Sequence, residues 1–104
     1  MLKISTEFRK GVLFVRLVGR IDNEGYLEKI NNIIDQMGIQ CIVLNLNNLN
    51  DVSLDSIDHI IKYNNEILKK NKQLLICDAN NIRNRLFKKI IPNIISEIEA
   101  FSLI

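Results

Sequence analysis

The period at which apolar residues recur changes near residue 22, and this change constrains the fold more than any other feature of the sequence. Residues 2–8 and 12–18 show the alternation of β-strands, and residues 9–11, which include a glycine, join them. Both alternating faces of residues 12–18 are largely apolar, which is typical of a strand inside a sheet. The short glycine-containing connection predicts that the two strands form a hairpin.

After residue 22 the apolar residues recur at helical spacing, from Leu27 to Met37. The polar residues 22–24 supply a cap and first-turn acids, and Gly38 is the expected end of this first helix. Its inward face is expected to comprise Leu27, Ile30, Ile33, Ile34 and Met37.

A second strand-and-helix unit is predicted at residues 41–70. The β-branched run Cys41–Leu46 predicts a buried strand, and the Asn-rich segment Asn47–Asp51 predicts a loop, because Asn and Asp favour turns. A helix is expected from Ser53 to Lys70. Its inner stripe is expected to comprise Ile57, Ile60, Ile61, Asn64, Ile67 and Leu68. Asn64 interrupts this stripe and is expected near its solvent-exposed edge.

The C-terminal third of the chain predicts the remaining elements. Gln73–Cys77 is read as another buried strand, and Asn80 and Asn81 are expected to cap a third helix that Pro92 ends. The inward residues of that helix are expected to be Ile82, Leu86, Phe87 and Ile90. A last short strand is predicted at Ile94–Ile95. A short terminal helix is predicted within Ser96–Ile104, with Ala100, Phe101 and Leu103 packed inward.

Strands that alternate with helices predict an α/β fold. The expected sheet is mixed, with an N-terminal hairpin followed by parallel crossovers and with helices packed against it. At 104 residues, the chain is expected to form one domain, residues 1–104.

Charge and hydropathy argue against several classes of partner. A net charge of +2 is too small to attract nucleic acid or an anionic membrane, so we expect neither. No signal-like apolar region begins the chain and no run approaches the ~18 apolar residues of a membrane span, which favours a cytoplasmic protein. Cys41 and Cys77 each lie in an apolar run, so two buried free thiols are favoured over a disulfide or a metal site.

Motifs for catalysis and cofactor binding are missing from the sequence. The four glycines do not stand in phosphate-loop spacing, and His59 is the sole histidine, expected at a solvated or boundary position. We therefore expect no enzymatic activity, no metal and no cofactor. A basic cluster comprises Arg83, Arg85, Lys88 and Lys89. A solvated helix face explains this cluster better than a nucleic-acid patch, because Phe87 falls on the core stripe and leaves no aromatic to stack on bases.

The polar segment at residues 50–58 lies where a strand, a loop and a helix meet. Ser53 is placed to cap the helix and Asp55 to oppose the positive end of its dipole, and capping alone accounts for this composition. A phosphorylation switch is the functional alternative, although Asp51, Asp55 and Asp58 would repel a phosphate.

Three stretches of the chain resemble the STAS domain, the fold of the bacterial anti-sigma factor antagonists: Val12–Asp22, Ile42–Leu49 and Leu74–Phe87. The resemblance covers nearly the whole chain and implies a STAS-like mixed sheet. It also implies a cytosolic binding module that docks on an anti-sigma factor with serine-kinase activity and so frees a sigma factor for transcription.

The family's Asp-Ser-Ser-Gly motif, whose first serine is phosphorylated to break the complex, begins the second helix. Laid on this chain without a gap, it falls on Ser53-Leu54-Asp55-Ser56, so Leu54 stands at the phosphoacceptor position. Asp22 matches the family's aspartate after the second strand. The partner-binding surface that we expect comprises Asp22, Asn23, Asp51, Ser53, Leu54, Asp55 and Ser56.

Two forms of this function stay open: the switch has moved to Ser53 or Ser56, or the protein binds without regulation by phosphorylation. We favour the second, because an exposed leucine suits a constant protein contact. Two further readings are a self-associating subunit of a larger STAS assembly and a small-ligand site near Asp22, Asp51 and Asp55. A simple antagonist is expected to be a monomer or a weak homodimer.

Overall fold

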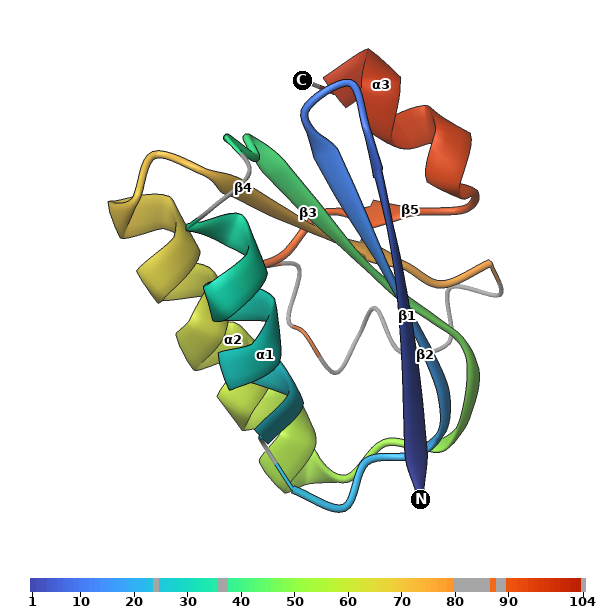
Figure 1. Cartoon of the computed structure of the whole chain (residues 1–104). Helices are drawn as coiled ribbons and strands as arrows, with labels where there is room; N and C mark the ends of the chain where they lie inside the picture. The colour runs from blue at the N-terminus through green and yellow to red at the C-terminus, as the bar shows by residue number, and fades with distance from the viewer. Residues whose placement is uncertain (24, 36–37, 80–86, 88–89, 104) are drawn as a thin grey trace.

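A mixed sheet of strand order β1-β2-β3-β4-β5 forms the centre of the protein (Figure 1). The computed structural model describes residues 1–23, 25–35, 38–79, 87 and 90–103. The elements within these residues are β1 (Leu2–Arg9), β2 (Val12–Arg20), α1 (Gly25–Ile34), β3 (Cys41–Asp51), α2 (Leu54–Lys69), β4 (Gln73–Cys77), β5 (Asn93–Ile94), the 3-10 helix η1 (Glu97–Glu99) and α3 (Ala100–Leu103). β1 is antiparallel to β2, and the other neighbouring strands are parallel, which confirms the predicted α/β sheet.

The hairpin between β1 and β2 is closed by a two-residue turn. Arg9 pairs with Val12, and the intervening Lys10 and Gly11 have φ angles of 51° and 83°. Positive φ at both central positions matches the right-handed twist of the strands, so this turn holds them in register. The predicted hairpin is confirmed.

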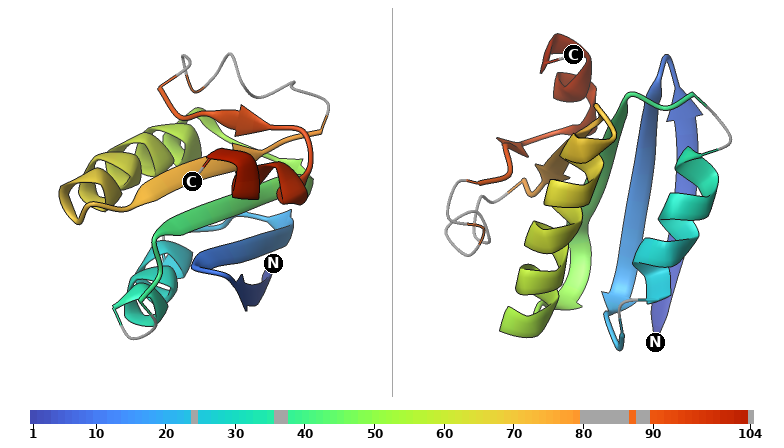
Figure 2. Two further views of the ribbon diagram at one scale, coloured as in Figure 1. Left: turned by 90° about the horizontal axis from the view of Figure 1, so that it is seen from above. Right: turned by 90° about the vertical axis from the view of Figure 1, so that its left-hand side faces the viewer.

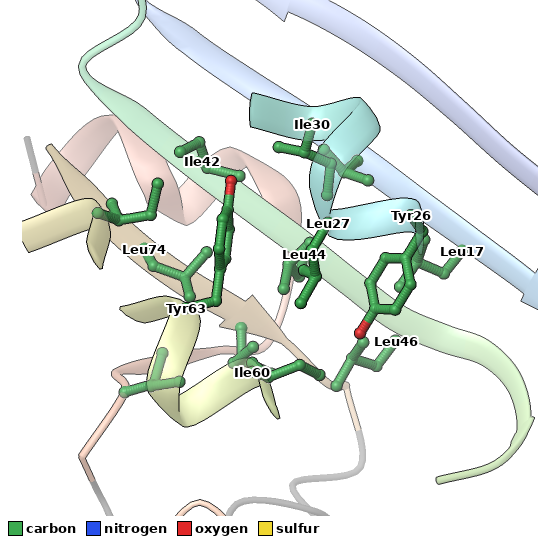
Figure 3. Close-up of a cluster of buried hydrophobic side chains, with 14 of the residues drawn as sticks. Leu17, Tyr26, Leu27, Ile30, Ile42, Leu44, Leu46, Ile60, Tyr63 and Leu74 are labelled. Carbon is green, nitrogen blue, oxygen red and sulfur yellow. The ribbon is translucent and has the colours of Figure 1, made fainter. Parts of the chain in front are cut away.

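The main core lies between the sheet and the helices α1 and α2, which cover the same face (Figures 1 and 3). Alternate strand residues such as Leu17 and Leu44 point toward these helices, and Ile30 and Ile60 meet them from α1 and α2. Every second strand residue and one face of each helix therefore pack against each other, and both sets of side chains are buried from water.

The opposite face of the sheet, called here the second face, carries a smaller core. Val12, Phe14, Cys41, Val43, Leu75, Cys77, Ile94 and Ala100 form this cluster. The C-terminal segment η1–α3 covers part of it, and the rings of Phe14 and Phe101 meet edge to face with centroids 5.8 Å apart. Figure 2 shows this segment apart from α1 and α2. The sheet is therefore apolar on both faces, as its central strands predicted.

β3 is longer than the sequence predicted: it includes Asn47–Asp51, so the prediction of a loop there was wrong. β2 extends to Arg20, and its last residues continue to pair with β3, up to Arg20 opposite Asp51, with two register shifts. Leu49 is buried by this pairing. Cross-strand pairing thus outweighs the preference of Asn for turns, because strand propensity depends strongly on tertiary context.

Four side chains differ in burial from the expectation. Asn64 is buried at 3% exposure rather than lying near a solvent-exposed edge, whereas Leu68 of the predicted inner stripe is 53% exposed. The buried stripe of α2 therefore runs through Tyr63, Asn64 and Ile67 and leaves Leu68 outside. Ile90 and Leu103 were expected to point inward and are about half exposed.

The remaining predictions have mixed outcomes. β5 consists of Asn93 and Ile94, so the predicted strand is displaced by one residue and Ile95 is exposed. Phe87 is buried as expected. Several predictions concern residues outside those that the structure describes. These are the cap at Asn80 and Asn81, the rest of the third helix with Ile82 and Leu86, Met37, and the basic cluster Arg83, Arg85, Lys88 and Lys89.

Candidate partner-binding site at the N-terminus of helix α2

Parallel pairing of β2 and β3 brings two parts of the predicted site to one end of the molecule. Arg20 pairs with Asp51 at the ends of these strands. Asp22 follows β2 by two residues, and α2 begins at Leu54. The starts of α1 and α2 therefore lie at the same end as the N-terminus (Figures 1 and 2).

The hydroxyl groups of Ser53 and Ser56 are bonded to each other and to the start of α2. Ser53 is the N-cap residue, with its Oγ accepting from the backbone N–H of Ser56 at 3.1 Å. The same Oγ donates to the Oγ of Ser56, also at 3.1 Å. Ser56 is 5% exposed, so its hydroxyl faces the interior. The capping role expected of Ser53 is confirmed.

Leu54 projects into solvent from the first turn of α2, with 70% of its surface exposed. Asp55 is exposed beside it, and Asp58, one helical turn beyond Leu54, is exposed as well. The backbone carbonyl of Asp55 lies 2.6 Å from Nδ1 of His59, whose ring is at the protein boundary as expected. This end of the helix thus presents one apolar side chain flanked by carboxylates.

Asp22 and Asn23 lie in the connection between β2 and α1. The carboxylate of Asp22 is 3.4 Å from the N-terminal ammonium of Met1, and both groups are exposed. Asn23 Oδ1 accepts from the N–H of Gly25 at 2.8 Å, which satisfies a backbone donor at the start of α1. Asn23 therefore has a structural role, and Asp22 is accessible from solvent.

Gly19 allows the N-terminus to approach this connection closely. Its φ is +102°, and a Cβ at this position would collide with the carbonyl oxygen of Met1. That carbonyl accepts from the N–H of Arg20 at 3.3 Å. A glycine is needed here for both its conformation and its small size.

Two hollows flank the helices, and they differ in their relation to the predicted site. One of about 490 Å³ lies between β1 and α1 and includes Asp22 and Asn23 in its lining, together with Leu2 and Ile4. The other, of about 720 Å³, lies beside the C-terminal half of α2, and its lining includes none of the predicted site residues. Within the described ranges, no group of three or more His, Cys, Asp or Glu side chains is placed to hold a metal ion.

A polar cluster on the second face was missed by sequence reasoning. Glu97 accepts from Arg16 at 2.7 Å and from Asn45 Nδ2 at 2.8 Å, and Arg16 also bonds to Glu7 at 3.1 Å. The hydrogen bond from Arg16 holds the pKa of Glu97 below its ordinary value. The polar residues Arg16 and Asn45 in otherwise apolar strands were the available signal. This cluster fastens the C-terminal segment to the sheet.

Cys41 and Cys77 are buried free thiols on the second face, as the sequence predicted. Burial raises the pKa of the Cys41 thiol to about 11 and also raises that of Cys77, which keeps both groups protonated at neutral pH. Among the helices that the structure describes, none has the length and apolar character needed to cross a bilayer.

Comparison with known proteins identifies similar sequences and structures. The family model of the STAS domain matches residues 3–96. The solved structure of the anti-sigma factor antagonist SpoIIAA in its unphosphorylated form superimposes with a TM-score of 0.76 at 16% identity, covering 99% of this chain and 96% of that one. An anti-sigma factor antagonist from Mycobacterium paratuberculosis has the same TM-score at 14% identity, covering 99% of this chain and 93% of that one.

Proposed function

The chain belongs to the STAS domain family, and we propose that it acts as an anti-sigma factor antagonist, a non-enzymatic module that binds an anti-sigma factor and so frees a sigma factor for transcription. The two solved proteins of the same fold support this role, since both are described as antagonists. We place it in the bacterial cytoplasm, a reducing compartment that suits two buried free thiols.

The exposure of Leu54 carries the proposal. Leu54 is 70% exposed, so it contributes little to the protein's own core. Burying a leucine in an interface contributes about 1.5–3 kcal/mol, enough to anchor a contact. Carboxylates of Asp22, Asp55 and Asp58 surround this end of the fold. The partner surface that fits is an apolar pocket with a basic rim.

The same geometry supports binding without a phosphorylation switch. Leu54 has no hydroxyl, and Ser56 is 5% exposed with its hydroxyl bonded to Ser53. A phosphate on Ser53 would regain backbone donors at the start of α2, but it would also place a dianion beside the exposed carboxylate of Asp55. The complex with the anti-sigma factor is therefore constitutive.

Substitution of Leu54 tests the docking surface. In titration calorimetry with the anti-sigma kinase of the same organism, Leu54→Lys raises Kd at least about tenfold, because a charge replaces the apolar anchor. Leu68→Lys is the matched control: Leu68 lies on the same helix and is 53% exposed, and this variant binds as the native protein does. Equal affinities of the two variants would place the docking surface elsewhere.

The absence of a switch is tested with ATP and the same kinase, followed by mass spectrometry. The native protein remains unmodified, whereas Leu54→Ser restores a hydroxyl at the family's acceptor position and takes up phosphate. Stoichiometric phosphate on Ser53 or Ser56 of the native protein contradicts constitutive binding.

A further inference from the structure

β1 is an exposed and regular edge strand. It is the outermost strand of the sheet, and no element that the structure describes pairs with its free side (Figure 2). Its pairing with β2 runs without a bulge from Leu2 opposite Gly19 to Arg9 opposite Val12, and its sequence contains no proline. Unpaired main-chain groups along such an edge are a template for another strand.

The tight turn decides which main-chain groups of β1 are unpaired. Arg9 and Val12 flank the two-residue turn, and the two residues that flank such a turn are hydrogen-bonded to each other. Along an antiparallel ladder, hydrogen-bonded pairs alternate with non-hydrogen-bonded pairs. The odd-numbered residues of β1 therefore bond to β2. The even-numbered residues, from Leu2 to Phe8, direct their N–H and C=O groups to the free side.

The side chains of β1 are complementary to those of a second copy about a two-fold axis at Ser5. Antiparallel pairing about this axis places Lys3 opposite Glu7 of the other copy, and Leu2 opposite Phe8 of the other copy. Because the axis is two-fold, each of these pairs occurs twice in the dimer. Lys3 is exposed and forms no ion pair with any residue in the described ranges. The side chain of Glu7 is 41% exposed, although its carboxylate already contacts Arg9 and Arg16.

Neighbouring registers lack this match. Moving the axis to Thr6 places Lys3 opposite Arg9, and moving it one residue further places Glu7 opposite Glu7. Like charges directly opposite each other destabilise a strand pair. The charge pattern of β1 therefore selects the register centred on Ser5.

The hollow between β1 and α1 supports the same register. Its wall includes Leu2 and Ile4, which lie on the helix-covered face of the sheet. Phe8, with 38% of its surface exposed, belongs to the same face. In the register centred on Ser5, Phe8 of the second copy comes opposite Leu2, on the face of the sheet where the hollow lies.

We infer that the protein forms a symmetric homodimer in which β1 pairs antiparallel with β1 of a second copy about an axis at Ser5. The two sheets become one continuous sheet, joined by about eight main-chain hydrogen bonds. The interface uses the outer side of β1 and not Leu54 or the first turn of α2. The inference is thus independent of the proposed function, and the two can fail separately.

Disulfide trapping tests the register. Ser5 lies opposite Ser5 of the second copy, and the two residues form a non-hydrogen-bonded pair. The Cα atoms of such a pair are about 4.5 Å apart, which is within the range of a disulfide. Ser5→Cys is therefore expected to crosslink two copies on oxidation. Thr6→Cys is the matched control, because its Cα atoms lie about 8 Å apart in this register, beyond that range. The native thiols are buried and do not compete. Crosslinking of both variants alike, of Thr6→Cys alone or of neither overturns the inference.

Charge exchange tests the dimer itself in sedimentation equilibrium. In a dimer of either variant, Lys3→Glu or Glu7→Lys, residues 3 and 7 of the two copies carry like charges at both places where they face each other. The Kd of dimer dissociation is therefore expected to rise at least about tenfold for each variant alone. Mixing the two variants restores both opposite-charge pairs and yields a heterodimer, an outcome that a mere loss of stability does not produce. Lys62→Glu makes the same charge change on an exposed position of α2 and leaves the dimer intact. A native protein that sediments as a monomer at its highest soluble concentration, or a mixture that stays monomeric, overturns the inference.

Discussion

Tyr63 shows at the scale of one residue that burial does not always come with a hydrogen bond. Its hydroxyl is buried and has no hydrogen-bond partner within the described residues, although the ring packs into the main core (Figure 3). Burial, with smaller effects of nearby charges, raises the pKa of this phenol well above its usual value. A buried hydroxyl without a partner costs about 1–3 kcal/mol, so this hydroxyl lowers the stability of the fold.

Tyr63→Phe is therefore expected to stabilise the protein. It removes the unpaired oxygen and keeps the ring, so the free energy of unfolding in urea rises by about 1 kcal/mol. Ile60→Val, which trims the same helix by one methylene, lowers it by about 1 kcal/mol and serves as a control for packing. A loss of stability in Tyr63→Phe would mean that the hydroxyl has a partner in solution.

At the scale of elements, one carboxylate links the C-terminal segment η1–α3 to two strands of the sheet. Glu97 joins this segment to β2 through Arg16 and to β3 through Asn45. Because the folded protein lowers the pKa of Glu97, its contribution to stability is present above the unfolded value of about 4.3 and is lost as pH falls through the folded value. The segment is thus held more tightly at neutral pH than in acid.

Glu97→Gln tests this dependence. Both side chains of the Glu97–Arg16 pair are partly exposed, so the substitution lowers the free energy of unfolding at pH 7 by only about 1 kcal/mol. The gap between native protein and variant closes as pH falls through the lowered pKa of Glu97, where the native carboxylate becomes protonated too. Urea unfolding of both proteins at a series of pH values measures this difference in the free energy of unfolding. A gap that is the same at all pH values would assign the effect to packing rather than to charge.

At the scale of the whole molecule, the two cysteines report whether the sheet opens in parts. Cys41 and Cys77 are at most 1% exposed and lie on neighbouring strands of the second face. Sγ of Cys77 lies 3.9 Å from the carbonyl oxygen of Ile95, which leads into the C-terminal segment. Neither thiol reaches solvent while this face stays closed.

Labelling with a thiol reagent is expected to modify both cysteines together. If the sheet unfolds as one cooperative unit, the two sites react at one rate, and this rate rises with urea as global unfolding does. Peptide mapping after short reaction times separates the two sites. Faster labelling of Cys77 than of Cys41, independent of urea, would show that the C-terminal segment opens by itself.

The sequence alone determined the elements whose signal is local. Period and a short glycine-containing connection predicted the hairpin of residues 2–8 and 12–18, and helical spacing predicted α1 and α2. The resemblance of three stretches to STAS domains predicted the family and placed Leu54 at the start of α2, where Ser53 caps the helix. Each of these depends on residues close together in the chain, which the sequence displays directly.

Only the tertiary structure decided what depends on distant neighbours. Asn47–Asp51 became strand because β2 pairs with it, and Asn64 is buried because of how α2 packs. Glu97 meets Arg16 across 81 positions, and the free side of β1 is an edge only once the order of strands is known. Local propensities differ by about 1 kcal/mol or less per residue, so pairing and burial, which the sequence does not display, outweigh them.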